Sequence, residues 1–162
     1  ETPESVLWLL EPAPQTISNL LRESSRRQID SKRIIFAPAK PLAEHLGRLQ
    51  LADLALDTFP YTSHTTASDA LWAGVPLITR IGETFASRVA ASLLHAVGLP
   101  ELVATSEDEY LLLVRTLVRS RETLDRTRAK IESIRMTTPL FDTKQFAADL
   151  ESLYLGTCRN GV

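Results

Sequence analysis

The residues best suited to chemistry stand between two short apolar runs, at 54–57 and 75–79. His64, Thr65 and Thr66 occupy the point where a helix is predicted to begin, and Asp69 lies one turn further along it. The first N–H groups of a helix have no intrahelical acceptor and the dipole makes that end positive, so the position favours an anion. A diphosphate beside a sugar hydroxyl would suit this arrangement.

Thr66 and Asp69 also allow a plainer interpretation. They fit the pattern S/T-x-x-D/E of a capping box, which needs no ligand. His64 and Thr65 add further polar side chains at the same helix start, more than a cap requires. Together with the free N–H groups, these side chains could bind phosphate oxygens, which favours the anion site.

A second polar group is predicted on a short helix at 42–49. His45 and Arg48 lie three residues apart and therefore on one face of that helix. His45 follows closely after a predicted strand, where its ring could stack on a base or bond to it. Arg48 could equally be a solvated charge near the negative end of the helix. Ligands of open parallel sheets bind at the carboxyl ends of the strands, so the two loops could face one another there.

Short β-branched runs alternate with helical patterns along the chain, which predicts a parallel sheet with helices on both faces. We expect strands at 6–10, 34–37, 54–57, 75–79 and 102–103. We expect helices from 17 toward 30 and at 42–49, 66–72, 86–97, 110–118, 121–135 and 140–158. Trp8 and Trp72 have apolar neighbours and are expected in the core.

Bulk properties exclude several classes of protein. The chain has 162 residues, 44% of them hydrophobic, which fits one domain, 1–162, or a part of a larger protein. A net charge of −2 gives no sign of nucleic-acid binding. No apolar run is long enough to span a membrane, and the first residues do not resemble a signal peptide. Cys158 is the single cysteine, which fits a reducing cytoplasm.

The sequence offers no catalytic residue. It contains no GxGxxG fingerprint, no Ser-His-Asp or Cys-His set by spacing, and no cluster with the spacing of a metal site. No side chain stands out as a catalytic base. These features are typical of a binding half of an enzyme, and they make a nicotinamide dehydrogenase a distant alternative.

Several collinear stretches resemble the C-terminal part of the catalytic region of protein O-linked N-acetylglucosamine transferases, including the SPINDLY proteins. They are SVLWLL (5–10), RIIFAP (33–38), EHLGRLQLADLALDT (44–58), HTTASDALWAGVPLIT (64–79), GETFASRVAASLL (82–94) and PLFDTKQFAADLESLYL (139–155). The resemblance implies the C-terminal, Rossmann-like half of a glycosyltransferase-B fold. Its parent would be an inverting cytoplasmic enzyme with tetratricopeptide repeats, transferring N-acetylglucosamine from UDP to serine or threonine.

The family's binding residues carry over to positions already singled out here. By this resemblance His45 would contact the uracil, Arg48 would help fix the base, and Asp69 would bind the ribose hydroxyls. The diphosphate would be met by His64, Thr65 and Thr66. UDP-N-acetylglucosamine would be a substrate, with no cofactor and no metal. Two alternatives stay open: the same fold with another donor such as GDP-fucose, and a non-catalytic protein-interaction module.

Two departures from the family pattern carry expectations. Leu42 stands where the family usually has a lysine, while Lys40 precedes Pro41, which puts ribose contacts from that side in question. The family's first strand-helix unit precedes the matched region. Without it, the strands at 6–10 and 54–57 would either close up or leave a gap for another chain. The helix at 140–158 would pack on a missing domain, and its exposed face or the open strand edges could promote self-association.

Overall fold

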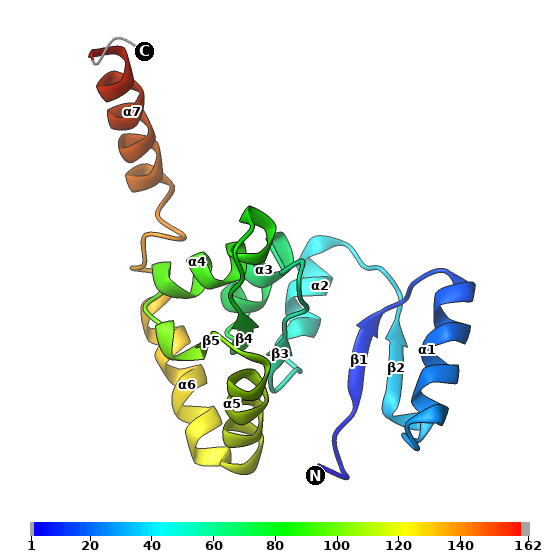
Figure 1. Cartoon of the computed structure of the whole chain (residues 1–162). Coiled ribbons are helices and arrows are strands. Elements are labelled where there is room, and N and C mark those ends of the chain that lie inside the picture. The colour runs from blue at the N-terminus through cyan, green and yellow to red at the C-terminus, as the bar shows by residue number, and fades with distance from the viewer. Residues whose placement is uncertain (1, 160–162) are drawn as a thin grey trace. The chain divides into compact units, whose positions relative to one another are not determined.

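The computed structural model describes residues 2–159 and contains two compact units, Glu1–His45 and Leu46–Val162. Every strand pairing in it is parallel. Helices flank the strands within each unit (Figure 1). The expected α/β class with a parallel sheet is therefore confirmed.

The first unit is one strand-helix-strand element. Strand β1 (Leu7–Leu10) leads through helix α1 (Pro14–Arg26) and a short 3-10 turn to strand β2 (Ile34–Ala37). Pro14 occupies the start of α1, where its missing N–H costs nothing. Arg33 ties the unit together, because its guanidinium donates to the carbonyl oxygens of Thr2 and Ser5.

The second unit contains a three-stranded sheet in the order β3-β4-β5. These strands are β3 (Ala55–Leu56), β4 (Leu77–Arg80) and β5 (Val103–Ala104). Helix α3 (Thr65–Trp72) joins β3 to β4, and helix α4 (Val89–Ala96) joins β4 to β5. Helix α2 (Leu42–Leu49) contains the boundary between the two units. Gly98, at φ +71°, ends α4 as its position predicts.

The hydrophobic core of the second unit surrounds β4. Helices α3, α4 and α5 (Glu107–Arg119) all contact this strand, and α6 (Arg121–Ile134) packs on α5. Leu71, Ile78, Leu94, Leu99 and Ile131 are fully buried there. This packing shields the central strand from water.

Each unit has its own sheet. Strand β1 pairs with β2 in the first unit, and β3 pairs with β4 in the second. The expectation that the strands at 6–10 and 54–57 close up, or that another chain fills a gap between them, stays a prediction.

Two expectations about burial are wrong. Strand β1 has half-buried central residues and exposed ends, and Ser24 and Ala37 are the only buried residues between positions 2 and 45. A unit with one helix covers too little of its sheet to bury both faces. Trp8 is accordingly half-buried. Trp72 is 38% exposed and packs against Phe141 at the edge of the core, with ring centroids 5.1 Å apart.

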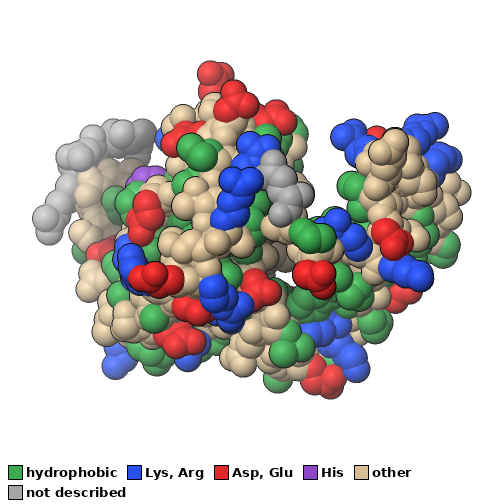
Figure 2. Space-filling model, turned by 90° about the horizontal axis from the view of Figure 1, so that it is seen from below, with side chains coloured by type: hydrophobic (Ala, Val, Ile, Leu, Met, Phe, Trp, Pro, Cys, Tyr) green, Lys and Arg blue, Asp and Glu red, His purple; other side chains and the backbone are tan. Residues whose placement is uncertain are grey.

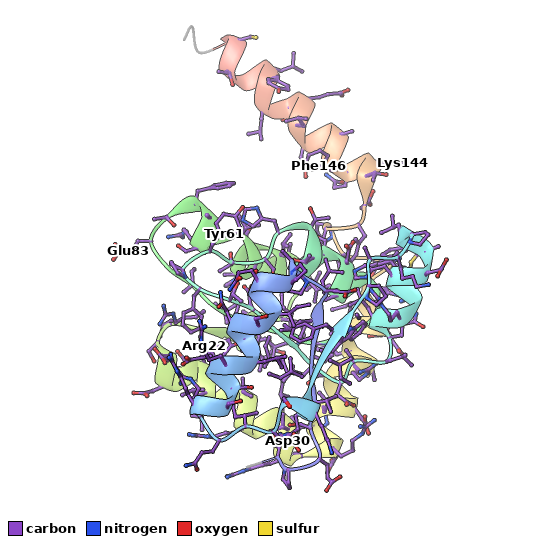
Figure 3. The ribbon with its side chains drawn as sticks, turned by 90° about the vertical axis from the view of Figure 1, so that its right-hand side faces the viewer. Arg22, Asp30, Tyr61, Glu83, Lys144 and Phe146 are labelled. Atoms are coloured by element: carbon purple, nitrogen blue, oxygen red, sulfur yellow. The ribbon has the colours of Figure 1, made fainter. Side chains whose placement is uncertain are left out.

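Helix α7 (Thr143–Arg159) begins three residues after the expected start at 140. The Asp142 carboxylate caps it by accepting from the backbone N–H groups of Lys144 and Gln145, near Phe146 (Figure 3). Nearly all of its side chains are exposed, including the large apolar residues Phe146, Leu150, Leu153, Tyr154 and Leu155. The apolar face is what a packing partner would cover, and that partner stays a prediction.

The surface carries mixed charge. Acidic and basic side chains are interspersed over the face seen in Figure 2, in keeping with a net charge of −2. Among the described helices, none combines the length and apolar character needed to cross a bilayer.

Candidate functional site

The start of helix α3 has the geometry of an anion site. The carbonyl oxygen of His64 is the first intrahelical acceptor, and the N–H groups of Ala67 and Ser68 donate to it at 3.1 and 3.2 Å. The N–H groups of Thr65 and Thr66 precede this first bond and have no helical carbonyl to reach. They are therefore placed to donate to a ligand, at the positive end of the helix dipole.

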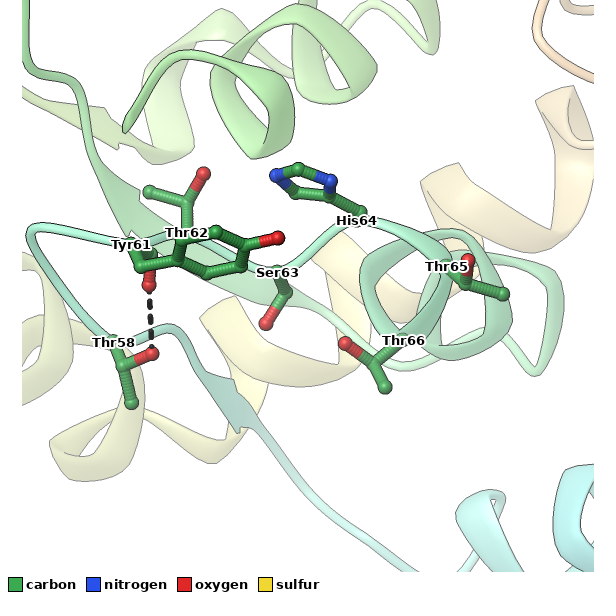
Figure 4. A pocket seen from close by; sticks show the side chains of 7 residues that line it. All are labelled: Thr58, Tyr61, Thr62, Ser63, His64, Thr65 and Thr66. Carbon is green, nitrogen blue, oxygen red and sulfur yellow. Dashed lines mark hydrogen bonds between the residues drawn. The ribbon is translucent and has the colours of Figure 1, made fainter. Parts of the chain in front are cut away.

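A pocket of about 350 Å³ opens at this helix start (Figure 4). It is lined by Thr58, Tyr61, Thr62, Ser63, His64, Thr65 and Thr66. The side chains come from the loop after β3 and from the first residues of α3, which is the carboxyl end of the sheet. The structure thus brings together three of the predicted site residues, His64, Thr65 and Thr66.

His64 has the most distinctive environment in this pocket. Its ring stacks on Tyr61, with centroids 5.0 Å apart and planes 15° from parallel, and meets the edge of Phe85 at 6.2 Å. Its Nε2 atom is buried and has no hydrogen-bond partner among residues 2–159. A buried polar atom without a partner is costly, so Nε2 is expected to bond to a ligand.

The capping-box interpretation of Thr66 and Asp69 is wrong. Helix α3 begins at Thr65, so Thr66 is already inside it, and no side chain caps this helix start. Residue 64, whose backbone adopts a non-helical conformation, is the N-cap. The shift by two residues leaves the helix N-terminus open, which supports the anion interpretation.

The remaining predicted residues lie outside this pocket's lining. Asp69 is half-buried in α3, one turn beyond Thr65. His45 and Arg48 lie in α2 at the expected spacing, both half-buried. Because the unit boundary follows His45, a meeting of its ring with the pocket stays a prediction. Leu42 is exposed at the start of α2.

Asp57, which is 4% exposed, anchors the loop between β3 and α3 through hydrogen bonds. One carboxylate oxygen accepts from the N–H groups of Thr58 and Ser63 at 2.9 and 2.7 Å, and the other accepts from the Thr79 hydroxyl at 2.6 Å. The Asp57 carbonyl oxygen accepts from the hydroxyl of Tyr110 at 3.0 Å. Four donors therefore converge on this residue.

Ionisation of the Tyr110 hydroxyl is expected to lower the free energy of unfolding at alkaline pH. Burial raises the pKa of Tyr110 to about 12, and the nearby Asp57 charge adds to this. Its stabilisation is complete below the ordinary tyrosine pKa of about 10 and is lost as pH rises through the folded value. Urea denaturation should show the free energy of unfolding falling between these pH values. Tyr110→Phe should abolish this part of the fall; an unchanged profile would contradict the assignment.

A second loop, outside the pocket lining, braces the first. The backbone N–H and hydroxyl of Thr62 both donate to the carbonyl oxygen of Ala86, at 3.0 and 2.7 Å. This joins the loop of Tyr61 to the loop of Glu83, which neighbour one another in Figure 3. Phe85 is 82% exposed on this second loop. The loop after β4 thereby supports the loop after β3, which lines the pocket.

Sequence reasoning missed the part of the site that precedes the helix. Thr58, Tyr61, Thr62 and Ser63 line the pocket, and Asp57 supports it, but none was singled out. The signal was a run of hydroxyl-bearing residues between a strand and a helix. No three His, Cys, Asp or Glu side chains gather into a possible metal site in the described part of the chain.

Comparison with known proteins identifies relatives of one kind. The family model described as glycosyl transferase family 41 matches residues 1–150. The UDP-N-acetylglucosamine–peptide N-acetylglucosaminyltransferase of Caenorhabditis elegans is 41% identical over 151 residues, covering 93% of this chain and 13% of that protein. The probable UDP-N-acetylglucosamine–peptide N-acetylglucosaminyltransferase SEC of Arabidopsis thaliana is 36% identical over 153 residues, covering 94% and 16%.

A solved structure shares the fold. A mutant of the O-GlcNAc transferase of Thermobaculum terrenum superimposes with a TM-score of 0.86 at 34% identity, covering 94% of this chain and 30% of that one. The chain thus spans less than a third of each of these relatives. The match of both sequence and structure over nearly the whole chain shows that it belongs to glycosyl transferase family 41.

Proposed function

We propose that this chain binds the donor UDP-N-acetylglucosamine in an enzyme that transfers N-acetylglucosamine to serine or threonine of proteins. The observation that carries the proposal is the buried, unpartnered Nε2 of His64 beside the free N–H groups that begin α3. A diphosphate supplies acceptor oxygens for all of these donors. The names of the relatives point to the same donor.

The pocket would contribute to catalysis by electrostatics and positioning. Transfer of the sugar leaves negative charge on the departing UDP, and preorganised donors lower the energy of that developing charge. His64, Thr65 and Thr66 would stabilise the diphosphate, while Asp69, His45 and Arg48 would hold the nucleoside. No metal is needed in this scheme, because the donors and the helix dipole face the charge directly.

The rest of the reaction belongs to other parts of the parent protein. We infer that these parts supply the acceptor site and the proton-transfer groups, since the relatives are several times longer than this chain. A tetratricopeptide array and a place in the cytoplasm belong to the same proposal. The exposed free thiol of Cys158 is compatible with a reducing compartment.

Asp69→Ala tests the donor assignment. In the native protein that contains this chain, we expect UDP binding to weaken about 10–100-fold, because a hydrogen bond to a charged group contributes about 1.5–3 kcal/mol. The free energy of unfolding should change by less than about 0.5 kcal/mol, since Asp69 caps no helix. Calorimetric titration with UDP and urea denaturation measure the two effects.

The matched control is Asp108→Ala, an exposed carboxylate on α5 outside the pocket lining, which should leave UDP affinity unchanged. Titration with GDP in parallel separates the donor alternatives. Tighter binding of GDP than of UDP would favour the GDP-sugar alternative. A mutant that loses stability but keeps UDP affinity would favour the interaction module.

A further inference from the structure

The loop that lines most of the pocket contains no helix or strand, yet several of its backbone groups make hydrogen bonds within the protein. Residues 58–63 connect β3 to α3 and contribute more than half of the pocket lining. Such a loop would be mobile if only solvent bonded its backbone. Here its first N–H, at Thr58, and its last, at Ser63, donate to the same carboxylate oxygen of Asp57. The two ends of the loop are thus clamped to one atom.

Asp57 is itself fixed by its surroundings. Its second carboxylate oxygen accepts from the hydroxyl of Thr79, which is fully buried on the central strand β4. Its carbonyl oxygen accepts from Tyr110 of α5, and its own N–H donates to the carbonyl oxygen of Ile78. The backbone bonds of Asp57 to Ile78 and Tyr110 hold the residue in place without the Thr79 hydroxyl.

The loop position decides where the donors of the anion site point. Ser63 is adjacent to His64, so the bond from its N–H to Asp57 sets the direction in which the chain enters α3. The backbone dihedral angles of His64 are not helical, and its carbonyl oxygen accepts the first hydrogen bonds of helix α3. A displacement of Ser63 would therefore move both the His64 ring and the free N–H groups of the helix start.

Resting on the proposed donor site, we propose that Asp57 is a positioning residue, whose buried carboxylate presets the loop and the helix start for the diphosphate. It acts through Thr58 and Ser63 and does not touch the donor itself. A site preset before binding pays less ordering entropy when the ligand arrives. Loss of the clamp should consequently weaken UDP binding even where the protein stays folded.

Three variants of the native protein that contains this chain separate positioning from stability. Asp57→Ala removes the acceptor of both loop N–H groups, and we expect the Kd for UDP to rise about 10–100-fold, as for a misplaced binding group. Asp57→Asn keeps an oxygen at that place and should restore affinity to near the wild-type value. Thr79→Val removes the hydroxyl beneath the carboxylate but keeps the loop acceptor, so it should lower the melting temperature with little change in Kd.

Two results would overturn the proposal. One is a folded Asp57→Ala variant with the wild-type Kd. The other is a Thr79→Val variant whose Kd rises as much as that of Asp57→Ala, because the effect would then follow stability alone. If the wild-type protein binds no UDP, the donor assignment itself fails. Binding that is insensitive to Asp57→Ala overturns only the positioning role.

Hydrogen exchange tests the preset loop without any variant. The amides of Thr58 and Ser63 should be protected in the free wild-type protein and stay protected when UDP is added. Exchange of these two amides at the rate of an unprotected chain in the free protein would contradict a preset loop. This measurement keeps the proposal testable if Asp57→Ala fails to fold.

Discussion

Replacing His64 by alanine should lower kcat/KM for UDP-N-acetylglucosamine by about 10²–10³-fold in the native protein that contains this chain. Loss of one preorganised donor to a developing negative charge has an effect of this size. The Nε2 atom of His64 is buried without a partner among residues 2–159, so it is already desolvated before the diphosphate binds. Transfer of labelled N-acetylglucosamine to an acceptor peptide measures the change.

His95→Ala is the matched control for this experiment. His95 lies on α4, where its Nδ1 is 2.7 Å from the carbonyl oxygen of Ala91, and it is not among the residues that line the pocket. Its loss should leave kcat/KM at the wild-type value. Equal activity of the His64 and His95 variants would show that the pocket at α3 does not act on the donor.

Replacing Leu94 by alanine should destabilise the 162-residue chain by about 2–5 kcal/mol, the usual cost of a buried leucine truncation. Leu94 is fully buried on α4, in the core cluster that also contains Ile78 of β4. The cavity would lie under the strand whose end supports the pocket. Urea denaturation followed by circular dichroism measures the loss.

Leu112→Ala removes the same atoms from an exposed position. Leu112 is 61% exposed on α5, so the free energy of unfolding should change by less than about 0.5 kcal/mol. Similar losses for the two variants would mean that the core around β4 is not the main source of stability. The difference between them is therefore the informative quantity.

The alternation of strands and helices was predictable because periodicity and stop signals agree along most of the chain. Gly98 follows α4 in a left-handed conformation, and the Asp142 carboxylate caps α7. Burial was less predictable, since it depends on what covers each element.

The first unit illustrates that limit. The apolar neighbours of Trp8 predict a place in the core, yet only α1 covers β1 and β2 in that unit. The apolar residues of a strand reflect all of the elements that pack against it in the folded protein. The pattern does not identify which elements of the chain those are.

The candidate site was predictable where a local rule applied. Polar residues at a helix start identify His64, Thr65 and Thr66, because an open helix N-terminus favours an anion by itself. The supporting roles of Asp57 and Tyr110 were not predicted. The hydrogen bond between these residues joins positions 53 apart and forms only when the chain folds. The capping-box prediction was wrong because the polar residues allow a helix that begins after His64 or after Thr66. Packing selects the first of these.

A crystal structure of the native protein with UDP tests the central claim most directly. The account predicts diphosphate oxygens within about 3 Å of His64 Nε2 and of the backbone nitrogens of Thr65 and Thr66. It also predicts that the loop at 58–63 keeps its bonds to Asp57. A bound UDP whose phosphates lie away from the start of α3, with His64 Nε2 still unpartnered, would contradict it.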